Sequence, residues 1–210
     1  MTSARLRDRV CLMARSLFER GLTPGSSGNI SVRLDDGGLL CTPTNASLGF
    51  LDPERLTVID REGRHVSGDA PTKEIPLHSA LYDGRGSSGA VVHLHSTHSV
   101  AVSMLPDIDP EDVFPPLTPY YLMKVGRTAL IPYHRPGDPA VGDAIRGLAG
   151  QYGSVLLSNH GPVVAGASLD AAVWAIEELE ETARLHLLLQ GHRPRLLSEE
   201  EVRQLRGDEH

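Results

Sequence analysis

The sequence predicts one compact domain of the α/β class. The chain has 210 residues, 40% of them apolar, which is enough for a sizeable core but too little for two full domains. Segments with helical spacing of apolar residues alternate with short apolar runs of strand length. No internal repeat or low-complexity tract interrupts the alternation, so residues 1–210 are expected to form a single domain.

The first half of the chain is predicted to contain two helices with four short strands between them. Ser3 can cap a helix that runs to about Arg20 and ends at Gly21, with an apolar stripe along one side. Pro76 is tolerated in the first turn of the second helix, predicted from Lys73 to Tyr82. Turn residues separate the apolar runs between these helices, which predicts strands at 30–34, 39–41, 56–59 and 64–66.

The second half of the chain alternates strands and helices more regularly. Strands are predicted at 91–95, 129–133 and 154–157, and helices at 97–104, 138–148 and 169–189. Residues 106–119 contain too many prolines for a regular element and are expected to form a surface excursion. The last long helix is expected to place its acidic run on a solvated face: Glu177, Glu178, Glu180 and Glu181. Ser198 and Glu201 fit a capping box, which predicts a short terminal helix.

Charge and cysteine usage narrow the classes of partner. The formal net charge is −7 and the basic residues are scattered, which argues against nucleic acid. No apolar stretch approaches the roughly 20 residues that a membrane span requires, so no membrane partner is expected. Cys11 and Cys41 lie in unrelated contexts, which is typical of a reduced cytoplasmic protein rather than of a disulfide framework.

A pair of histidines on the strand from Val91 to His95 is the central chemical feature. Alternate strand residues point to one face, so His93 and His95 project together with Cα atoms about 7 Å apart, while Leu94 points to the opposite face. Neutral imidazole is a common zinc ligand, so two rings placed in this way can bind one metal ion. The pair alone is equally compatible with two half-buried, hydrogen-bonded histidines.

Further polar residues around this strand favour a metal site. Packing requires neither Glu74, near the start of a helix, nor His160, just after an apolar strand. A carboxylate near a helix start is also favoured by the helix dipole, which is the alternative explanation for Glu74. His78 lies one turn after Glu74 and is expected to support a ligand or to belong to the core, and His98 is a reserve ligand.

Two loops and two tyrosines complete the set of candidate site residues. The small-residue loop Thr23–Asn29 offers N–H groups and hydroxyls that suit an anion, although such loops are often simple turns. Thr42–Asn45 is a second candidate anion contact, one hairpin later. Tyr120 and Tyr121 are typical packing or interface residues, but a phenol there could deliver a proton to a reacting carbon.

Five motifs occur in a fixed order over nearly the whole chain: Gly25-x-x-Gly28-Asn29-x-Ser31, Thr42-Pro43-Thr44, Lys73-Glu74, His93-x-His95 and Asn159-His160-Gly161. Their joint pattern resembles the class II aldolase/adducin family. The resemblance implies a three-layer α/β/α fold with a central mixed, largely antiparallel sheet. Within the family, segments 68–78, 95–98, 105–109 and 118–121 resemble the 3-oxo-tetronate 4-phosphate decarboxylases most, followed by the fuculose-phosphate aldolases.

The resemblance also implies the residues of the site. Zn²⁺ is expected to be bound by His93, His95 and His160, with Glu74 as a fourth ligand that can swing away to act as acid or base. Mn²⁺ or Co²⁺ also suit these ligands. A phosphate site is implied at Ser26, Ser27, Gly28, Asn29, Thr44 and Thr72. Asn45 and Lys73 belong to the predicted substrate site, but the family's sugar-phosphate aldolases tend to have a glycine and a second hydroxyl residue there, so substrate choice is expected to differ.

The implied function is a carboxy-lyase that converts a 3-oxo-tetronate 4-phosphate to dihydroxyacetone phosphate and CO₂. Metal stabilisation of an enediolate explains the reaction, with Glu74, Tyr120 or Tyr121 returning a proton to C2. Retro-aldol cleavage requires the same enediolate, so an aldolase or epimerase acting on a phosphorylated sugar is the alternative. A third alternative is a non-catalytic interaction domain like the adducin head. The resemblance implies a homotetramer with active sites near subunit interfaces.

Overall fold

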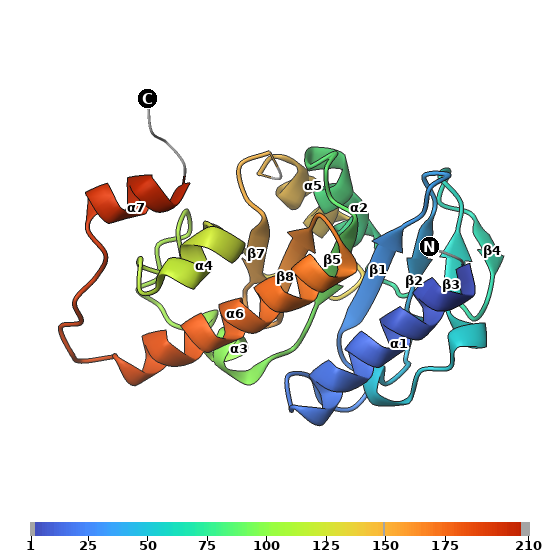
Figure 1. Ribbon diagram of the computed structural model, residues 1–210, viewed down its shortest axis with the longest axis horizontal. Helices are drawn as coiled ribbons and strands as arrows, with labels where there is room; N and C mark the ends of the chain where they lie inside the picture. Colours follow the sequence, from blue (N-terminus) through green and yellow to red (C-terminus); the bar gives the residue numbers. More distant parts are fainter. Residues whose placement is uncertain (1–2, 149, 207–210) are drawn as a thin grey trace.

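The computed structural model describes residues 3–148 and 150–206, and an eight-stranded sheet forms its centre (Figure 1). The sheet order is β4-β3-β2-β1-β5-β8-β7-β6. Every neighbouring pair is antiparallel except β6 and β7, so the expected mixed, largely antiparallel sheet is confirmed. The strands are β1 Asn29–Arg33, β2 Leu39–Cys41, β3 Thr57–Ile59, β4 His65–Ser67, β5 Ala90–His93, β6 Thr128–Ile131, β7 Ser154–Leu157 and β8 Gly161–Gly166.

Helices cover both faces of the sheet and give the expected three layers. Successive residues of β5 show the division, because Val92 packs into the core under α1 and α6 whereas Val91 packs into the core under α2 and α5. The first layer contains α1 Ser3–Glu19, α3 Thr97–Val102, α4 Pro119–Lys124 and α6 Leu169–Leu188, and the second contains α2 Ile75–Gly84 and α5 Ala140–Arg146. The remaining helices are η1 Leu48–Phe50, η2 Pro53–Arg55 and α7 Glu199–Arg206.

The C-terminal segment packs at one end of the molecule. After α6 the chain crosses to α7, which contacts α4. The predicted capping box is present, since Ser198 Oγ accepts the Glu201 N–H and the Glu201 carboxylate accepts the Ser198 N–H. Within the described residues, no helix combines the length and the apolar character needed to cross a membrane.

Strand β8 was not predicted from the sequence, although it lies at the centre of the sheet. Gly161 and Pro162 at its start argue against a central strand, because proline lacks the N–H that a ladder uses. Here the ladder uses the other group of Pro162, since its carbonyl accepts the Leu94 N–H at 3.2 Å. The missing donor therefore costs little, and the rest of the strand pairs with β5 and β7.

The predicted surface excursion over 106–119 is wrong in part. Val113 and Phe114 are 3% and 2% exposed and belong to the core under α6. The chain then forms α4, which the sequence analysis did not predict even though Thr118 caps it and Pro119 occupies its first turn. The prolines of this segment therefore terminate and start elements while apolar side chains between them fill the core.

The acidic run of α6 is also not entirely solvated. Glu180 is only 6% exposed and accepts hydrogen bonds from the backbone N–H groups of His98 and Ser99 at the start of α3. His98 Nδ1 lies 2.8 Å from the same carboxylate. His98, expected as a reserve metal ligand, instead joins α3 to α6.

Candidate metal and substrate site

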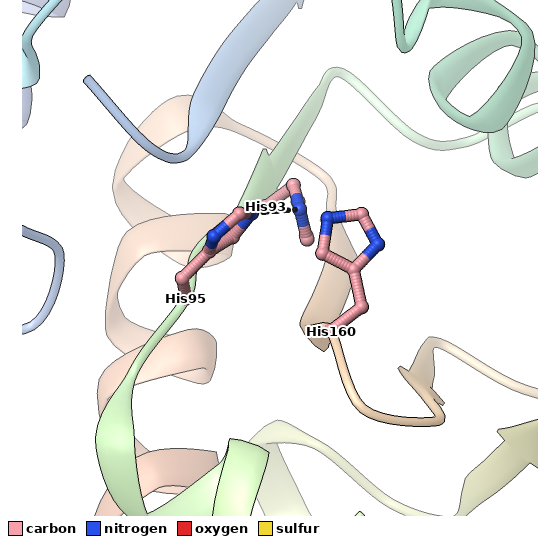
Figure 2. A group of neighbouring side chains, drawn as sticks. All are labelled: His93, His95 and His160. Carbon is pink, nitrogen blue, oxygen red and sulfur yellow. Dashed lines mark hydrogen bonds between the residues drawn. The ribbon is translucent and has the colours of Figure 1, made fainter. Parts of the chain in front are cut away.

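Three histidine side chains meet where the end of β5 faces the turn between β7 and β8 (Figure 2). One nitrogen from each ring, those of His93, His95 and His160, lies within 4.8 Å of the other two. Strand β5 ends at His93, two residues earlier than predicted. The backbone of Leu94 stays hydrogen bonded to β8, so His95 still projects to the same side as His93.

A tight turn brings His160 to this pair. Asn159 adopts a left-handed backbone conformation with φ of 57°, and Gly161 follows with φ of 152°. A Cβ atom added to Gly161 would lie 2.2 Å from the Leu94 carbonyl oxygen. Glycine is therefore required at this position for the turn to approach the end of β5, and this approach positions the imidazole of His160.

Glu74 completes the cluster from the other side. Helix α2 begins at Ile75, so Glu74 occupies its N-cap position rather than its first turn, and its carboxylate makes no capping bond. Glu74 Oε2 lies 3.5 Å from His93 Nε2, and Oε1 lies 3.5 Å from His160 Nε2. Four groups from three distant parts of the chain therefore converge, as the sequence resemblance implies.

The three imidazoles are close enough to hold one cation, and Glu74 lies beside them. The Nε2 atoms of His93 and His95 are 3.1 Å apart. Each carboxylate oxygen of Glu74 approaches a different ring, Oε2 that of His93 and Oε1 that of His160, both at 3.5 Å. His93 Nδ1 donates to the Pro162 carbonyl at 2.9 Å, which leaves a lone pair on Nε2 directed into the cluster.

Electrostatics favour a bound cation. Burial lowers the pKa of His93 to about 4 and also brings the pKa of His95 and of His160 below the ordinary value. Burial by itself would raise the pKa of Glu74, but His93 and the hydrogen bond from Asn29 hold it below its ordinary value. At neutral pH the cluster therefore consists of neutral imidazoles and one carboxylate, the protonation states that a divalent metal requires.

A buried polar chain supports Glu74. Asn29 Nδ2 donates to Glu74 Oε2 at 2.7 Å, and Asn29 Oδ1 accepts from His78 Nε2 at 2.5 Å. His78 Nδ1 then accepts from Ser31 Oγ, which also contacts the Tyr82 hydroxyl. Burial lowers the pKa of His78 to about 3, so the ring is neutral and holds the amide of Asn29 in one orientation. His78 was expected either to support a ligand or to belong to the core, and in the structure it is buried and also orients Asn29.

The structure brings part of the predicted phosphate site to the metal cluster. Gly28 lies against the end of β5, where an added Cβ would be 2.9 Å from the His93 carbonyl oxygen. Thr72 accepts the Glu74 N–H through its hydroxyl at 3.3 Å, and the side chain of Lys73 is exposed beside it. Asn29, another of the predicted phosphate residues, donates a hydrogen bond to Glu74.

The other predicted phosphate residues lie further out. The Ser27 hydroxyl bonds within its own loop to Thr23 Oγ1 and to the Pro24 carbonyl, and Ser26 is exposed. Thr44 and Asn45 line a separate pocket that also includes Arg55 and Asp69. Their contribution to phosphate binding stays a prediction.

The two predicted tyrosines occupy different environments. Tyr121 is fully buried, with its hydroxyl 3.1 Å from Thr128 Oγ1 and its ring packed edge-on against Phe114. Tyr120 is 59% exposed, and the ammonium of Lys124 lies over its ring. Proton donation by either tyrosine stays a prediction.

The sequence analysis missed a pocket that opens beside Glu74 and His160. The pocket is small and partly open to solvent, and the loop between β6 and α5 forms one wall. The loop sequence Arg135-Pro136-Gly137-Asp138 is typical of a tight turn and was the available clue. The remaining lining combines basic and apolar side chains: Lys73, Pro76, Leu77, Pro132, His134, Val141 and Leu157.

The protein thus has a three-layer α/β fold with a candidate metal site of three histidines, next to a glycine loop and a pocket that contains Lys73 and Arg135. The chain belongs to the class II aldolase and adducin family: residues 8–187 match the domain described as Class II Aldolase and Adducin N-terminal domain. The family predicted from the sequence motifs is thus confirmed.

Three relatives are informative. The chain is 52% identical over 188 residues to the 3-oxo-tetronate 4-phosphate decarboxylase of Cupriavidus necator, which covers 90% of this chain and 86% of the relative. It is 30% identical over 215 residues to the L-fuculose phosphate aldolase of Haemophilus influenzae, covering 100% of this chain and 96% of the aldolase. The crystal structure of YgbL from Escherichia coli matches with a TM-score of 0.95 at 45% identity, covering 97% of this chain and 99% of that one.

Proposed function

We propose that this protein is a metal-dependent carboxy-lyase that converts a 3-oxo-tetronate 4-phosphate to dihydroxyacetone phosphate and CO₂. The observation that carries the proposal is the convergence of Glu74 with His93, His95 and His160 beside the glycine loop. The similarity to the Cupriavidus necator decarboxylase supports the choice of substrate. The ligand set of three imidazoles and one carboxylate favours Zn²⁺, and Mn²⁺ or Co²⁺ are alternatives.

The reaction breaks the C1–C2 bond of the substrate. The electron pair of that bond passes to C2 and is delocalised onto the C3 oxygen, CO₂ departs, and a proton added at C2 gives dihydroxyacetone phosphate. When bound, the metal supplies the positive charge that stabilises the negative charge on the C2 and C3 oxygens. The protein contributes binding of the two ends of the substrate and delivery of the proton.

Glu74, after taking up a proton from solvent, is the first candidate for the proton donor at C2. Its carboxylate already lies within the histidine cluster, and the hydrogen bond from Asn29 restricts its orientation. Tyr120 and Tyr121 are the other candidates from the sequence. Glu74→Gln, Tyr120→Phe and Tyr121→Phe distinguish them, because only the variant of the donor slows proton incorporation at C2 when turnover is followed in D₂O.

The phosphate is proposed to bind on the glycine-loop side of the metal. Backbone N–H groups around Ser26, Ser27 and Gly28 suit its charge, with hydroxyls from Thr72 and Thr44 and a further contact from Asn45. Lys73, which the sequence resemblance also placed in the substrate site, borders the pocket on the other side of Glu74. Holding the phosphate fixes the carbon chain relative to the metal ligands and thereby aligns the breaking C–C bond.

Assembly and location form part of the same proposal. Residues 1–210 are proposed to act as a single domain, in a homotetramer, in the cytoplasm. Size-exclusion chromatography with light scattering tests the assembly, and a monomer at assay concentration contradicts it.

The deciding experiment measures products. The purified protein, loaded with one equivalent of zinc, is expected to release CO₂ and dihydroxyacetone phosphate in equal amounts from 3-oxo-tetronate 4-phosphate. Chelation of the metal should abolish both products, and zinc should restore them. No turnover by a zinc-loaded, folded protein rejects the proposal.

An aldolase acting on a phosphorylated sugar is the second candidate function. The 30% identity with L-fuculose phosphate aldolase over the full length of this chain favours it. The same protein supplied with L-fuculose 1-phosphate would then release an aldehyde without CO₂. Failure to retain zinc together with no product from either substrate would instead support a non-catalytic domain.

A further inference from the structure

We propose that Arg135 and Lys73 form a subsite for the C1 carboxylate of the substrate and so select sugar acids over neutral sugars. The inference rests on the proposed function for the identity of the substrate. The two residues come from different elements, Lys73 preceding α2 and Arg135 following β6, yet both line the pocket that reaches Glu74 and His160.

A rigid turn positions Arg135. The Asp138 N–H donates to the Arg135 carbonyl at 2.9 Å, with Pro136 and Gly137 between them and φ of 80° at the glycine. Proline followed by a glycine with positive φ is the pattern of a type II turn, so the conformation is largely set before a ligand binds. The Asp138 carboxylate accepts the Ala140 N–H at 2.9 Å at the start of α5.

The same turn packs directly against Lys73. A Cβ added to Gly137 would lie 3.4 Å from Lys73 Cβ and 3.7 Å from its carbonyl oxygen. The two cations therefore border one small volume rather than separate surfaces, and its boundary also includes Glu74 and His160.

The charges of both residues remain available for a ligand. Neither Lys73 nor Arg135 forms an ion pair or a side-chain hydrogen bond within residues 3–148 and 150–206. Other arginines of this acidic chain are paired, for example Arg9 with Asp170 and Arg127 with Asp112. A planar guanidinium beside a flexible ammonium matches a carboxylate, which accepts two parallel bonds from the fork of arginine.

The position of the pocket indicates which anion it binds. The glycine loop approaches Glu74 from the Asn29 side, whereas Gly137 and Arg135 border the pocket on the Lys73 and His160 side. A four-carbon substrate held at its C2 and C3 oxygens presents its phosphate and its carboxylate at opposite ends. With the phosphate at the glycine loop, the carboxylate faces Arg135.

The pocket also has an apolar boundary. Leu77, Val141 and Leu157 are among the residues that line it. The carboxylate loses its charge as the C–C bond breaks, so contact with Arg135 is strongest in the bound substrate and weakens toward the transition state. Arg135 is therefore a residue for binding and orientation, and its loss should raise KM without lowering kcat.

The test compares two ligands that share the phosphate but differ in the carboxylate. Tetronate 4-phosphate, which lacks the 3-oxo group and cannot be decarboxylated, carries both anions, and dihydroxyacetone phosphate carries only the phosphate. Calorimetric titration of the purified, zinc-loaded protein gives the dissociation constant of each ligand without any turnover.

Arg135→Gln should weaken binding of tetronate 4-phosphate by about 10- to 100-fold and leave dihydroxyacetone phosphate within about 3-fold, since only the charge-assisted bonds to the carboxylate are lost. Arg135→Lys keeps the charge without the fork and should fall between these values. Arg184→Gln removes an exposed arginine from α6 and controls for net charge.

Two results would overturn the subsite. Equal weakening of both ligands would assign Arg135 to the phosphate, and unchanged binding of both would remove it from the site. If the wild-type protein binds tetronate 4-phosphate with the predicted dependence on Arg135 yet releases no CO₂ from the 3-oxo acid, the proposed reaction is rejected while the carboxylate subsite stands.

Discussion

Two clusters among the described residues join a largely buried glutamate to histidine, and they differ in how completely the hydrogen bonds of the carboxylate are satisfied. At the start of α3, the two oxygens of Glu180 receive four contacts from His98 and Ser99, two from backbone N–H groups and two from side chains, at 2.7–2.9 Å. At the end of β5, Glu74 accepts a single side-chain hydrogen bond, from Asn29, and otherwise faces imidazole nitrogens at 3.5 Å.

This difference predicts a structural role for the Glu180 cluster and cation binding for the Glu74 cluster. Donors that already fill the lone pairs of Glu180 leave no room for a cation and join two helices instead. Around Glu74, several lone pairs point into one small volume without donors, which is unfavourable unless a cation occupies it. Convergent acceptors, rather than acidic and histidine residues as such, mark the functional site.

The largest expected effect is the loss of a ligand. His160→Ala should remove most of the bound metal and lower kcat/KM for CO₂ release by at least about 1,000-fold, roughly 4 kcal/mol of transition-state stabilisation. Metal content is measured on protein purified without chelator. His98→Ala is the matched control and should retain the metal, because His98 contacts Glu180 instead. Equal metal loss in both variants would contradict the contrast between the clusters.

Removal of the structural carboxylate should affect stability instead of metal binding. Glu180→Gln should lower the free energy of unfolding by about 2–4 kcal/mol, because an amide presents one acceptor oxygen to donors that now contact two. Urea denaturation with metal analysis of the same samples checks both halves of the prediction. Loss of the metal with unchanged stability would contradict it.

The effect of Glu180→Gln should also depend on pH. Burial alone would raise the pKa of Glu180, but the hydrogen bonds from Ser99 and His98 hold it below its ordinary value of 4.5. A depressed pKa stabilises the folded state above about pH 4.5 and loses that contribution as the pH falls through the lower, folded value. The difference in stability between wild type and variant should therefore shrink on acidification, and a difference that grows would contradict this.

Disruption of the polar chain behind Glu74 should have an intermediate effect. His78→Phe leaves the Asn29 amide without its anchor and should weaken metal affinity by about 10- to 100-fold. Competition with a chelator of known affinity measures this change. Tyr82→Phe alters the far end of the same chain, at Ser31, and should change metal affinity much less. Similar losses in both variants would indicate a general effect on the core.

The smallest effect is expected from one donor of the structural cluster. Ser99→Ala removes the 2.7 Å hydroxyl contact to Glu180 but leaves the other three, so stability should fall by only about 1 kcal/mol. Thermal and urea unfolding measure the change, and CO₂ release should remain at the wild-type rate. A loss as large as that of Glu180→Gln would mean that the four contacts act as a single unit.

Local patterns in the sequence predicted most elements and the projection of His93 and His95 to one side of their strand. The capping box at Ser198, the apolar stripe of α1 and the alternation around His93 depend on neighbours a few residues away, and each is found in the structure. Errors occurred where a distant contact outweighed the local pattern. The strand that contains Pro162 was not predicted, because proline is atypical of a strand inside a sheet. Glu180 was assigned to the surface because nothing nearby in the sequence indicates the N–H groups of α3.

The sequence by itself determined the family, the mixed α/β class and the identities of the four residues that converge in the candidate metal site, because motifs and side-chain periodicity are properties of short segments. Only the tertiary structure decided what surrounds them: the orientation of Glu74 by Asn29 and His78, the close approach of Gly161 to Leu94, and the basic pocket where Gly137 meets Lys73. These features join residues far apart in the chain, and their positions follow from how the sheet and its two helical layers pack.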